Sequence, residues 1–70
     1  MREKPGVAIV GCGLIGEKRA SHLGAAQLVA CVDTVQDRSI ALADRFAGAR
    51  SETDWRETIS ARDVDIVIVC

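Results

Sequence analysis

The chain has 70 residues, a formal net charge of −1 at pH 7 and a hydrophobic fraction of 49%. This composition predicts a cored, folded chain, although the length is below that of a typical domain. Charges of both signs are interspersed, and no apolar run approaches the ~18 residues of a membrane span. We therefore expect neither nucleic acid nor a membrane as a partner.

A glycine-rich hexad follows the first predicted strand, residues 7–10. The hexad, residues 11–16 (GCGLIG), opens a segment predicted to be helical from Gly16 to Leu23, with Gly24 as the helix stop. A second apolar run, residues 28–32, ends on an acid 22 residues after the hexad begins. Three glycines alone would fit an ordinary loop, but the whole arrangement indicates a dinucleotide site.

Each residue type in the hexad suits this chemistry. Gly11 permits a tight turn, Gly13 leaves room for a pyrophosphate, and Gly16 lets the helix pack closely on the sheet. The free N–H groups of the helix start, from Leu14 through Ile15 to Gly16, would face the phosphates.

The strand-end acid, Asp33, is predicted to accept hydrogen bonds from the adenosine ribose, the alternative being a plain turn residue. A carboxylate at this place repels a 2′-phosphate and therefore favours NAD. Arg38 lies five residues further on and could fold back to accommodate NADP as the second choice.

The remaining elements continue to alternate. A helix is predicted over residues 37–47 with Gly48 as its cap and an apolar face of Leu42, Ala43 and Phe46. A very short strand follows at residues 49–51.

Thr53 or Asp54 can then cap a third helix, in which Trp55 and Ile59 are one turn apart and Trp55 is expected in the core. Residues 64–70 are predicted to form a buried strand.

This order predicts an α/β Rossmann-type fold, a parallel sheet in the order 3-2-1-4 with right-handed crossover helices. The chain ends on Cys70, at the tip of the fourth strand, so we expect residues 1–70 to be the N-terminal part of a dinucleotide-binding domain, truncated after that strand. A catalytic or substrate domain is absent from the chain.

The sequence also resembles a known family. Residues 7–16, 28–33 and 65–70, together with Asp54-Trp55, are similar to the start of the glucose–fructose oxidoreductase, inositol dehydrogenase and rhizopine catabolism (Gfo/Idh/MocA) family. The resemblance implies an NAD(P)-dependent oxidoreductase acting on a sugar, polyol, nucleotide sugar or related carbonyl compound. It also implies a homo-oligomeric parent protein.

By matching positions, the resemblance places the pyrophosphate on the hexad, the ribose on Asp33 and Thr34, and Cys70 near the cofactor. Many members have His three residues after the third glycine, where this chain has Arg19, and His22 is expected on the solvated helix surface. The family's catalytic lysine belongs to a downstream Glu-Lys-Pro motif. Glu3-Lys4-Pro5 precedes the first strand and cannot be that motif, so no catalytic residue is assigned and the 70 residues alone are expected to be inactive.

Cys12, Cys31 and Cys70 are widely spaced and odd in number, which predicts neither a metal site nor a disulfide framework but buried thiols in a reducing cytoplasm. A non-enzymatic nucleotide-sensing module with the same binding residues is the alternative to an enzyme.

Overall fold

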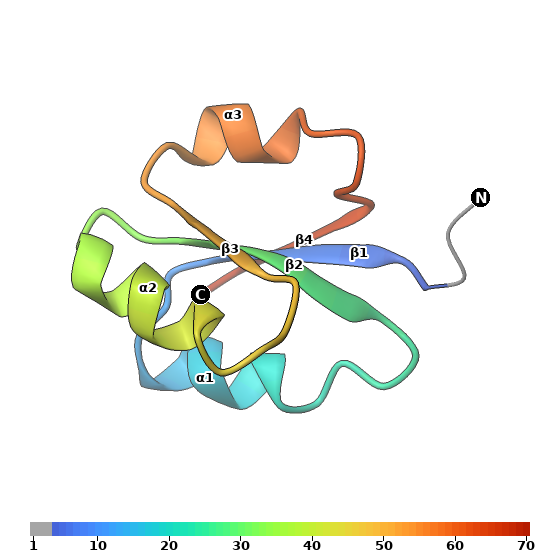
Figure 1. Cartoon of the computed structure of the whole chain (residues 1–70), viewed down its shortest axis with the longest axis horizontal. Coiled ribbons are helices and arrows are strands. Elements are labelled where there is room, and N and C mark those ends of the chain that lie inside the picture. Colours follow the sequence, from blue (N-terminus) through green and yellow to red (C-terminus); the bar gives the residue numbers. More distant parts are fainter. Residues whose placement is uncertain (1–3) are drawn as a thin grey trace.

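The computed structural model describes residues 4–70, so Glu3 of the N-terminal Glu-Lys-Pro sequence lies outside the described residues. One four-stranded parallel sheet has the order β3-β2-β1-β4 (Figure 1). Its strands are β1 (Gly6–Val10), β2 (Gln27–Val32), β3 (Arg50–Glu52) and β4 (Ile66–Val69). The predicted fold class and strand order are confirmed.

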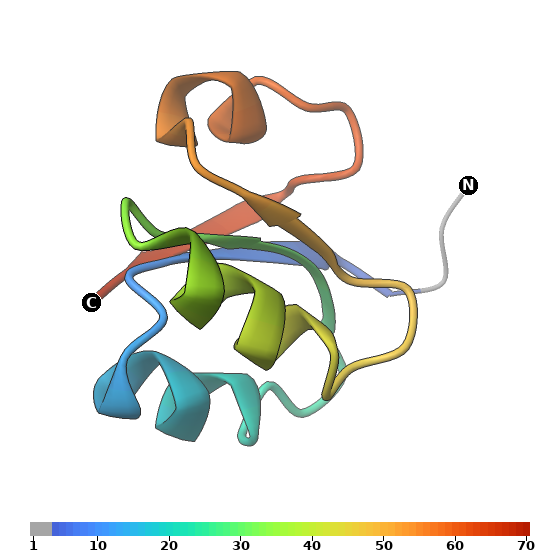
Figure 2. The same cartoon turned by 60° about the vertical axis from the view of Figure 1, so that its left-hand side comes forward.

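Helices lie on both faces of this sheet. α1 (Leu14–Ala20) and α2 (Gln36–Ala43) cover one face, and α3 (Trp55–Ile59) lies on the other, as Figures 1 and 2 both show. Within residues 4–70, no helix has the length and apolar content needed to cross a membrane.

The core follows from the alternation of side chains along β1. Val7 and Ile9 point to the α1 and α2 face, where they join a cluster with Leu42 of α2. Ala8 points the other way, into a smaller cluster with Val29 and Ala30. Apolar residues on both faces are typical of a parallel sheet covered by helices.

A shift in strand register between β1 and β2 alters that alternation. Val7 pairs with Leu28, but the next residue, Ala8, pairs with Ala30, so Val29 is the extra residue of a bulge. Consequently Leu28 and Cys31, three residues apart, both belong to the cluster on the α1 and α2 face.

Two helices are shorter than their sequence patterns predict. α1 ends at Ala20 rather than Leu23, and α2 covers Gln36–Ala43 rather than residues 37–47. After each helix the chain tightens into turns with i→i−3 hydrogen bonds, such as His22 N to Arg19 O (3.1 Å) and Phe46 N to Ala43 O (3.1 Å). Glycines 24 and 48 have positive φ, but they lie in the following loops and do not cap the helices.

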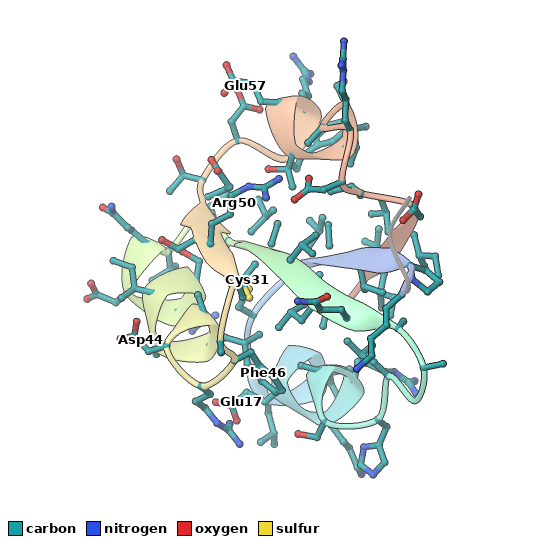
Figure 3. The ribbon with its side chains drawn as sticks, turned by 45° about the vertical axis from the view of Figure 1, so that its right-hand side comes forward. Glu17, Cys31, Asp44, Phe46, Arg50 and Glu57 are labelled. Atoms are coloured by element: carbon teal, nitrogen blue, oxygen red, sulfur yellow. The ribbon has the colours of Figure 1, made fainter. Side chains whose placement is uncertain are left out.

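Phe46 still packs against the larger cluster, because the turn after α2 directs its ring toward α1 (Figure 3). Two smaller differences concern the next elements. β3 begins one residue later than predicted, and Asp54, not Thr53, caps α3 by accepting a hydrogen bond from Arg56 N at 2.9 Å.

The predictions of a buried fourth strand and a core tryptophan are wrong for the described chain. Val69 is 77% exposed and Ile66 43%, because β4 is an edge strand and α3 covers only part of its face. Trp55 is 47% exposed, and its ring stacks under the guanidinium of Arg56 at 5.3 Å instead of entering the core.

Candidate functional site

The glycine turn between β1 and α1 lies at the carboxyl edge of the sheet, beside the ends of β2 and β4. Gly11 N donates to Val32 O at 2.7 Å, and Cys70 N donates to Val10 O at 2.9 Å. Gly11 has a φ of +99°, and a Cβ there would lie 2.6 Å from Cys70 O. Only glycine therefore fits the point where the chain leaves β1.

The other two glycines of the hexad have contrasting surroundings. A Cβ on Gly16 would collide with the carbonyl oxygen of Gly11 and lie 3.4 Å from Ile9 Cγ2, which confirms the close packing expected of α1. A Cβ on Gly13 would meet nothing within 4 Å. The turn is thus packed on its inner side and open at Gly13.

The start of α1 presents backbone donors to this open side. The helical hydrogen bonds begin with Glu17 N, which donates to Gly13 O at 3.0 Å. The N–H groups of Leu14, Ile15 and Gly16 precede that bond, so they have no partner within the helix. Leu14 and Ile15 are exposed, whereas Gly16 is buried against the sheet.

Asp33 directly follows β2 and lies beside the turn. Its Oδ2 accepts from Cys12 N and its Oδ1 from Val35 N, both at 2.8 Å. These two hydrogen bonds, with a smaller contribution from the charge of Arg38, hold the pKa of Asp33 below its ordinary value. The carboxylate is therefore ionised at neutral pH.

An open groove of about 310 Å³ runs from the glycine turn to α2. Gly13, Leu14 and Arg38 line it, as do Glu17 and Asp37, two carboxylates that the sequence analysis did not assign to the site. Their positions in the sequence offered a signal for both, since Glu17 directly follows the hexad and Asp37 directly precedes Arg38. Thr34 is exposed next to Asp33.

The structure thus gathers the sequence-predicted residues at one edge of the sheet: Gly11, Gly13, Leu14, Ile15, Gly16, Asp33, Thr34, Arg38 and Cys70. What the sequence analysis missed is the backbone N–H of Cys12, which binds Asp33. Every residue except proline has a backbone N–H, so the residue type does not indicate which N–H binds a side chain.

Of the three thiols expected to be buried, Cys12 and Cys31 are buried, but Cys70 is exposed at the end of edge strand β4. The two buried thiols are not poised for chemistry. Burial, followed by the charge of Asp33, raises the pKa of Cys12 to about 11, and burial raises the pKa of Cys31 to about 12. Cys12 Sγ instead donates to Val32 O at 3.3 Å. Among residues 4–70, no group of three or more metal-ligating side chains comes together.

His22 lies away from the groove. It is exposed beyond the end of α1, and its Nδ1 lies 2.8 Å from Lys18 O, a contact within its own turn. The expected exposure of this histidine is confirmed, but it lies in the turn after α1 and not on the helix, because α1 ends at Ala20.

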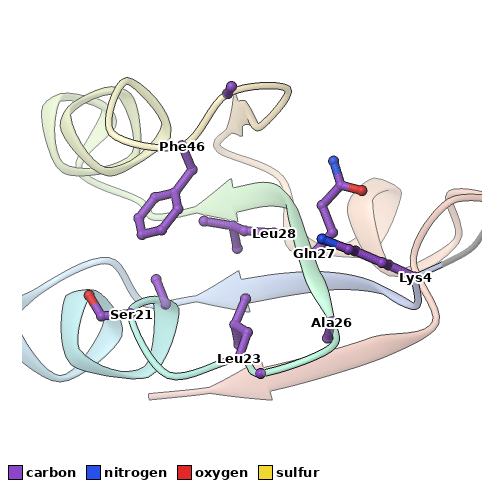
Figure 4. A pocket seen from close by; sticks show the side chains of 10 residues that line it. Lys4, Ser21, Leu23, Ala26, Gln27, Leu28 and Phe46 are labelled. Carbon is purple, nitrogen blue, oxygen red and sulfur yellow. The ribbon is translucent and has the colours of Figure 1, made fainter.

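Two further hollows lie elsewhere on the molecule. One, at the amino-terminal ends of the strands, is lined by Lys4, Ser21, Gln27 and Phe46 among others (Figure 4). The second is almost wholly apolar and lies between α3 and β4; we call it the apolar face, and it consists of Val10, Trp55, Ile59, Val67 and Val69. Neither includes a residue of the glycine turn.

Comparisons with known proteins agree with this geometry. The sequence profile of an oxidoreductase family with an NAD-binding Rossmann fold matches residues 6–70. A search of curated proteins gives no match.

Solved structures supply closer detail. GenD2 from gentamicin A biosynthesis, in complex with NAD, shares 34% identity and a TM-score of 0.88 over 100% of this chain and 21% of that chain. An NAD-binding oxidoreductase from Klebsiella pneumoniae shares 26% identity and a TM-score of 0.68 over 97% of this chain and 21% of that chain.

The myo-inositol dehydrogenase of Lactobacillus casei, in complex with NAD(H) and myo-inositol, has a TM-score of 0.88 over 96% of this chain and 21% of that chain. At 24% identity this likeness shows the fold alone. The chain therefore spans about a fifth of the length of these solved relatives.

Proposed function

Because the chain belongs to the Gfo/Idh/MocA oxidoreductase family with an NAD-binding Rossmann fold, we propose that its glycine turn and Asp33 hold NAD for hydride transfer. The observation that supports this most directly is the ionised carboxylate of Asp33 beside a turn that is open at Gly13.

The residues present fit a dinucleotide. In the proposal, the open side at Gly13 and the N–H groups of Leu14, Ile15 and Gly16 receive the pyrophosphate. Asp33 and Thr34 bind the adenosine ribose, and Arg38 lies at the side of the groove.

Gly11 keeps the turn close to Cys70, so the chain leaving β4 passes next to the cofactor. The nicotinamide supplies the hydride chemistry when it is bound, and the described residues bind and orient it.

Asp33 also supports the choice of NAD over NADP. An ionised carboxylate at the ribose accepts hydroxyl hydrogens but repels a 2′-phosphate. Arg38 lines the nearby groove, and its positive charge would attract a 2′-phosphate, so NADP is the second choice.

For the whole protein we propose an oxidoreductase that transfers a hydride between NAD and a sugar, polyol, nucleotide sugar or related carbonyl compound. GenD2, at 34% identity, comes from the biosynthesis of gentamicin A and binds NAD, while the substrate class proposed here is the one that the family resemblance implies. Membership of an oxidoreductase family favours an enzyme over a nucleotide-sensing module.

Since the chain spans about a fifth of its solved relatives, we propose that it is the N-terminal part of the cofactor domain, with the catalytic and substrate groups outside these 70 residues. The free cysteines are consistent with a cytoplasmic protein, as proposed from the sequence.

Titration of both cofactors tests the role of Asp33. Backbone amide shifts in the NMR spectrum of the ¹⁵N-labelled chain, followed at millimolar NAD or NADP, should change around residues 11–16 and 33–34. Asp33→Ala should weaken NAD binding by about 1–3 kcal/mol, the range for lost hydrogen bonds to a charged group. NADP should lose less, because the variant also removes a repulsive charge.

Asp37→Ala serves as the control, since it removes a carboxylate from the groove between the glycine turn and α2 but leaves Asp33 in place. An equal loss for NAD and NADP in Asp33→Ala would refute the ribose role.

A further inference from the structure

Both oxygens of the Asp33 carboxylate already bind the protein itself. One reaches back across the carboxyl edge to Cys12 N, inside the glycine turn, and the other accepts from Val35 N in the segment leading to α2. The side chain therefore ties together two loops that are 21 and two residues away in sequence.

These bonds belong to a wider attachment of the turn to the end of β2. Gly11 N and Cys12 Sγ both donate to Val32 O, at 2.7 and 3.3 Å. Among these hydrogen bonds between the glycine turn and the end of β2, only the one to Asp33 has a charged acceptor. Hydrogen bonds to a charged group are stronger than those between neutral groups. Cys12 N is thereby committed to Asp33 and is not directed at a ligand.

We propose that Asp33 is a positioning residue for the pyrophosphate as well as a ligand of the ribose. By fixing Cys12 N, its carboxylate holds the glycine turn in the shape that leaves Gly13 open at the start of α1. Each carboxylate oxygen can accept a second hydrogen bond, so ribose hydroxyls can bind while both protein contacts remain. This inference rests on the proposed NAD site.

The two roles make opposite predictions for an anion that has no ribose. If Asp33 only bound ribose, its removal would strengthen pyrophosphate binding, because a negative charge would be removed from beside the glycine turn. If Asp33 positions the turn, its removal weakens pyrophosphate binding despite that gain. Asp37 is the matched control, since it lines the groove next to the glycine turn and its carboxylate has no bond to the turn backbone among the hydrogen bonds of the described chain.

The test is a titration of the chain and its variants with inorganic pyrophosphate, followed by backbone amide shifts. Asp37→Ala should bind pyrophosphate at least as well as the unaltered chain. Asp33→Ala should bind about tenfold more weakly than Asp37→Ala, the equivalent of one lost charge-assisted hydrogen bond. Asp33→Asn, which keeps one oxygen acceptor, should fall between them.

Hydrogen exchange gives an independent readout that a general loss of stability would not reproduce. The amide of Cys12 should exchange faster in Asp33→Asn, while amides in the middle of β1 keep their protection. If Asp33→Ala does not fold, the comparison of Asp33→Asn with Asp37→Asn decides in its place.

Pyrophosphate affinity in the Asp33 variants equal to or above that of the Asp37 variants would overturn the positioning role and leave the NAD site standing. No pyrophosphate binding to the unaltered chain would overturn the proposed phosphate site, and this inference with it.

Discussion

At the scale of single residues, the three glycines of the hexad are not equivalent. Gly11 is required by its backbone conformation and by the approach of Cys70, and Gly16 by its contact with Gly11. Gly13 has no such structural requirement, because the space above it is empty of protein atoms. The fold does not require glycine at position 13, but the proposed phosphate site does. A substitution there can therefore change ligand binding without changing the stability of the fold.

Substitution of these glycines by alanine tests that distinction. Gly16→Ala should lower the free energy of unfolding by about 1–3 kcal/mol, the cost of forcing a methyl into a packed contact. Gly13→Ala should leave stability nearly unchanged but weaken NAD and pyrophosphate binding, because its methyl occupies the space left for the phosphates. Urea unfolding and the NMR titration measure the two effects. A Gly13→Ala variant with undiminished affinity would contradict the proposed place of the pyrophosphate.

At the scale of elements, α3 depends on its first residues more than the other helices do. It has five residues, and its N-cap, Asp54, is the one helix cap in the described chain with a side-chain hydrogen bond. Isolated helices of this length are unstable in water, so a cap contributes a large part of what holds such a helix.

Asp54→Ala should therefore destabilise the protein by about 0.5–2 kcal/mol, because Arg56 N loses its acceptor. Thr53→Ala is the natural control: the sequence allowed either residue to be the cap, and the structure places only Asp54 there. Urea unfolding of both variants measures the difference. Equal destabilisation by the two substitutions would show that the cap is not the source of the effect.

At the scale of the whole molecule, the two faces of the sheet are covered unequally. Two helices close the face with the larger cluster, while α3 leaves the apolar face open beside edge strand β4. Val69 at 77% exposure and Trp55 at 47% are unusual for a stable monomer surface. Contiguous apolar surface beside an unpaired strand edge favours association.

We expect the isolated 70-residue chain to self-associate as its concentration rises, and Val69→Lys to reduce that association by placing a charge on the edge strand. Sedimentation velocity over a range of concentrations measures it. Ile40→Lys is the control, since Ile40 is 39% exposed on α2, on the opposite side of the sheet. A similar reduction by both variants would indicate a general charge effect rather than contact through the apolar face.

The sequence by itself determined the path of the chain. Apolar runs separated by helical segments specify parallel strands and crossover helices, and the handedness of those crossovers leaves the order 3-2-1-4. The spacing from the hexad to Asp33 was enough to place both at the carboxyl edge, because the ends of neighbouring parallel strands meet there.

Tertiary structure alone decided how these parts meet. The bulge at Val29 depends on pairing between β1 and β2, and the exposure of β4 and Trp55 depends on which neighbours cover them. The ends of α1 and α2 depend on the turns that follow them. Helix propensity does not predict the i→i−3 hydrogen bonds that close those turns. The bond from Cys12 N to Asp33 joins a main-chain donor to a side chain across two elements, and only their packing brings those atoms within 2.8 Å.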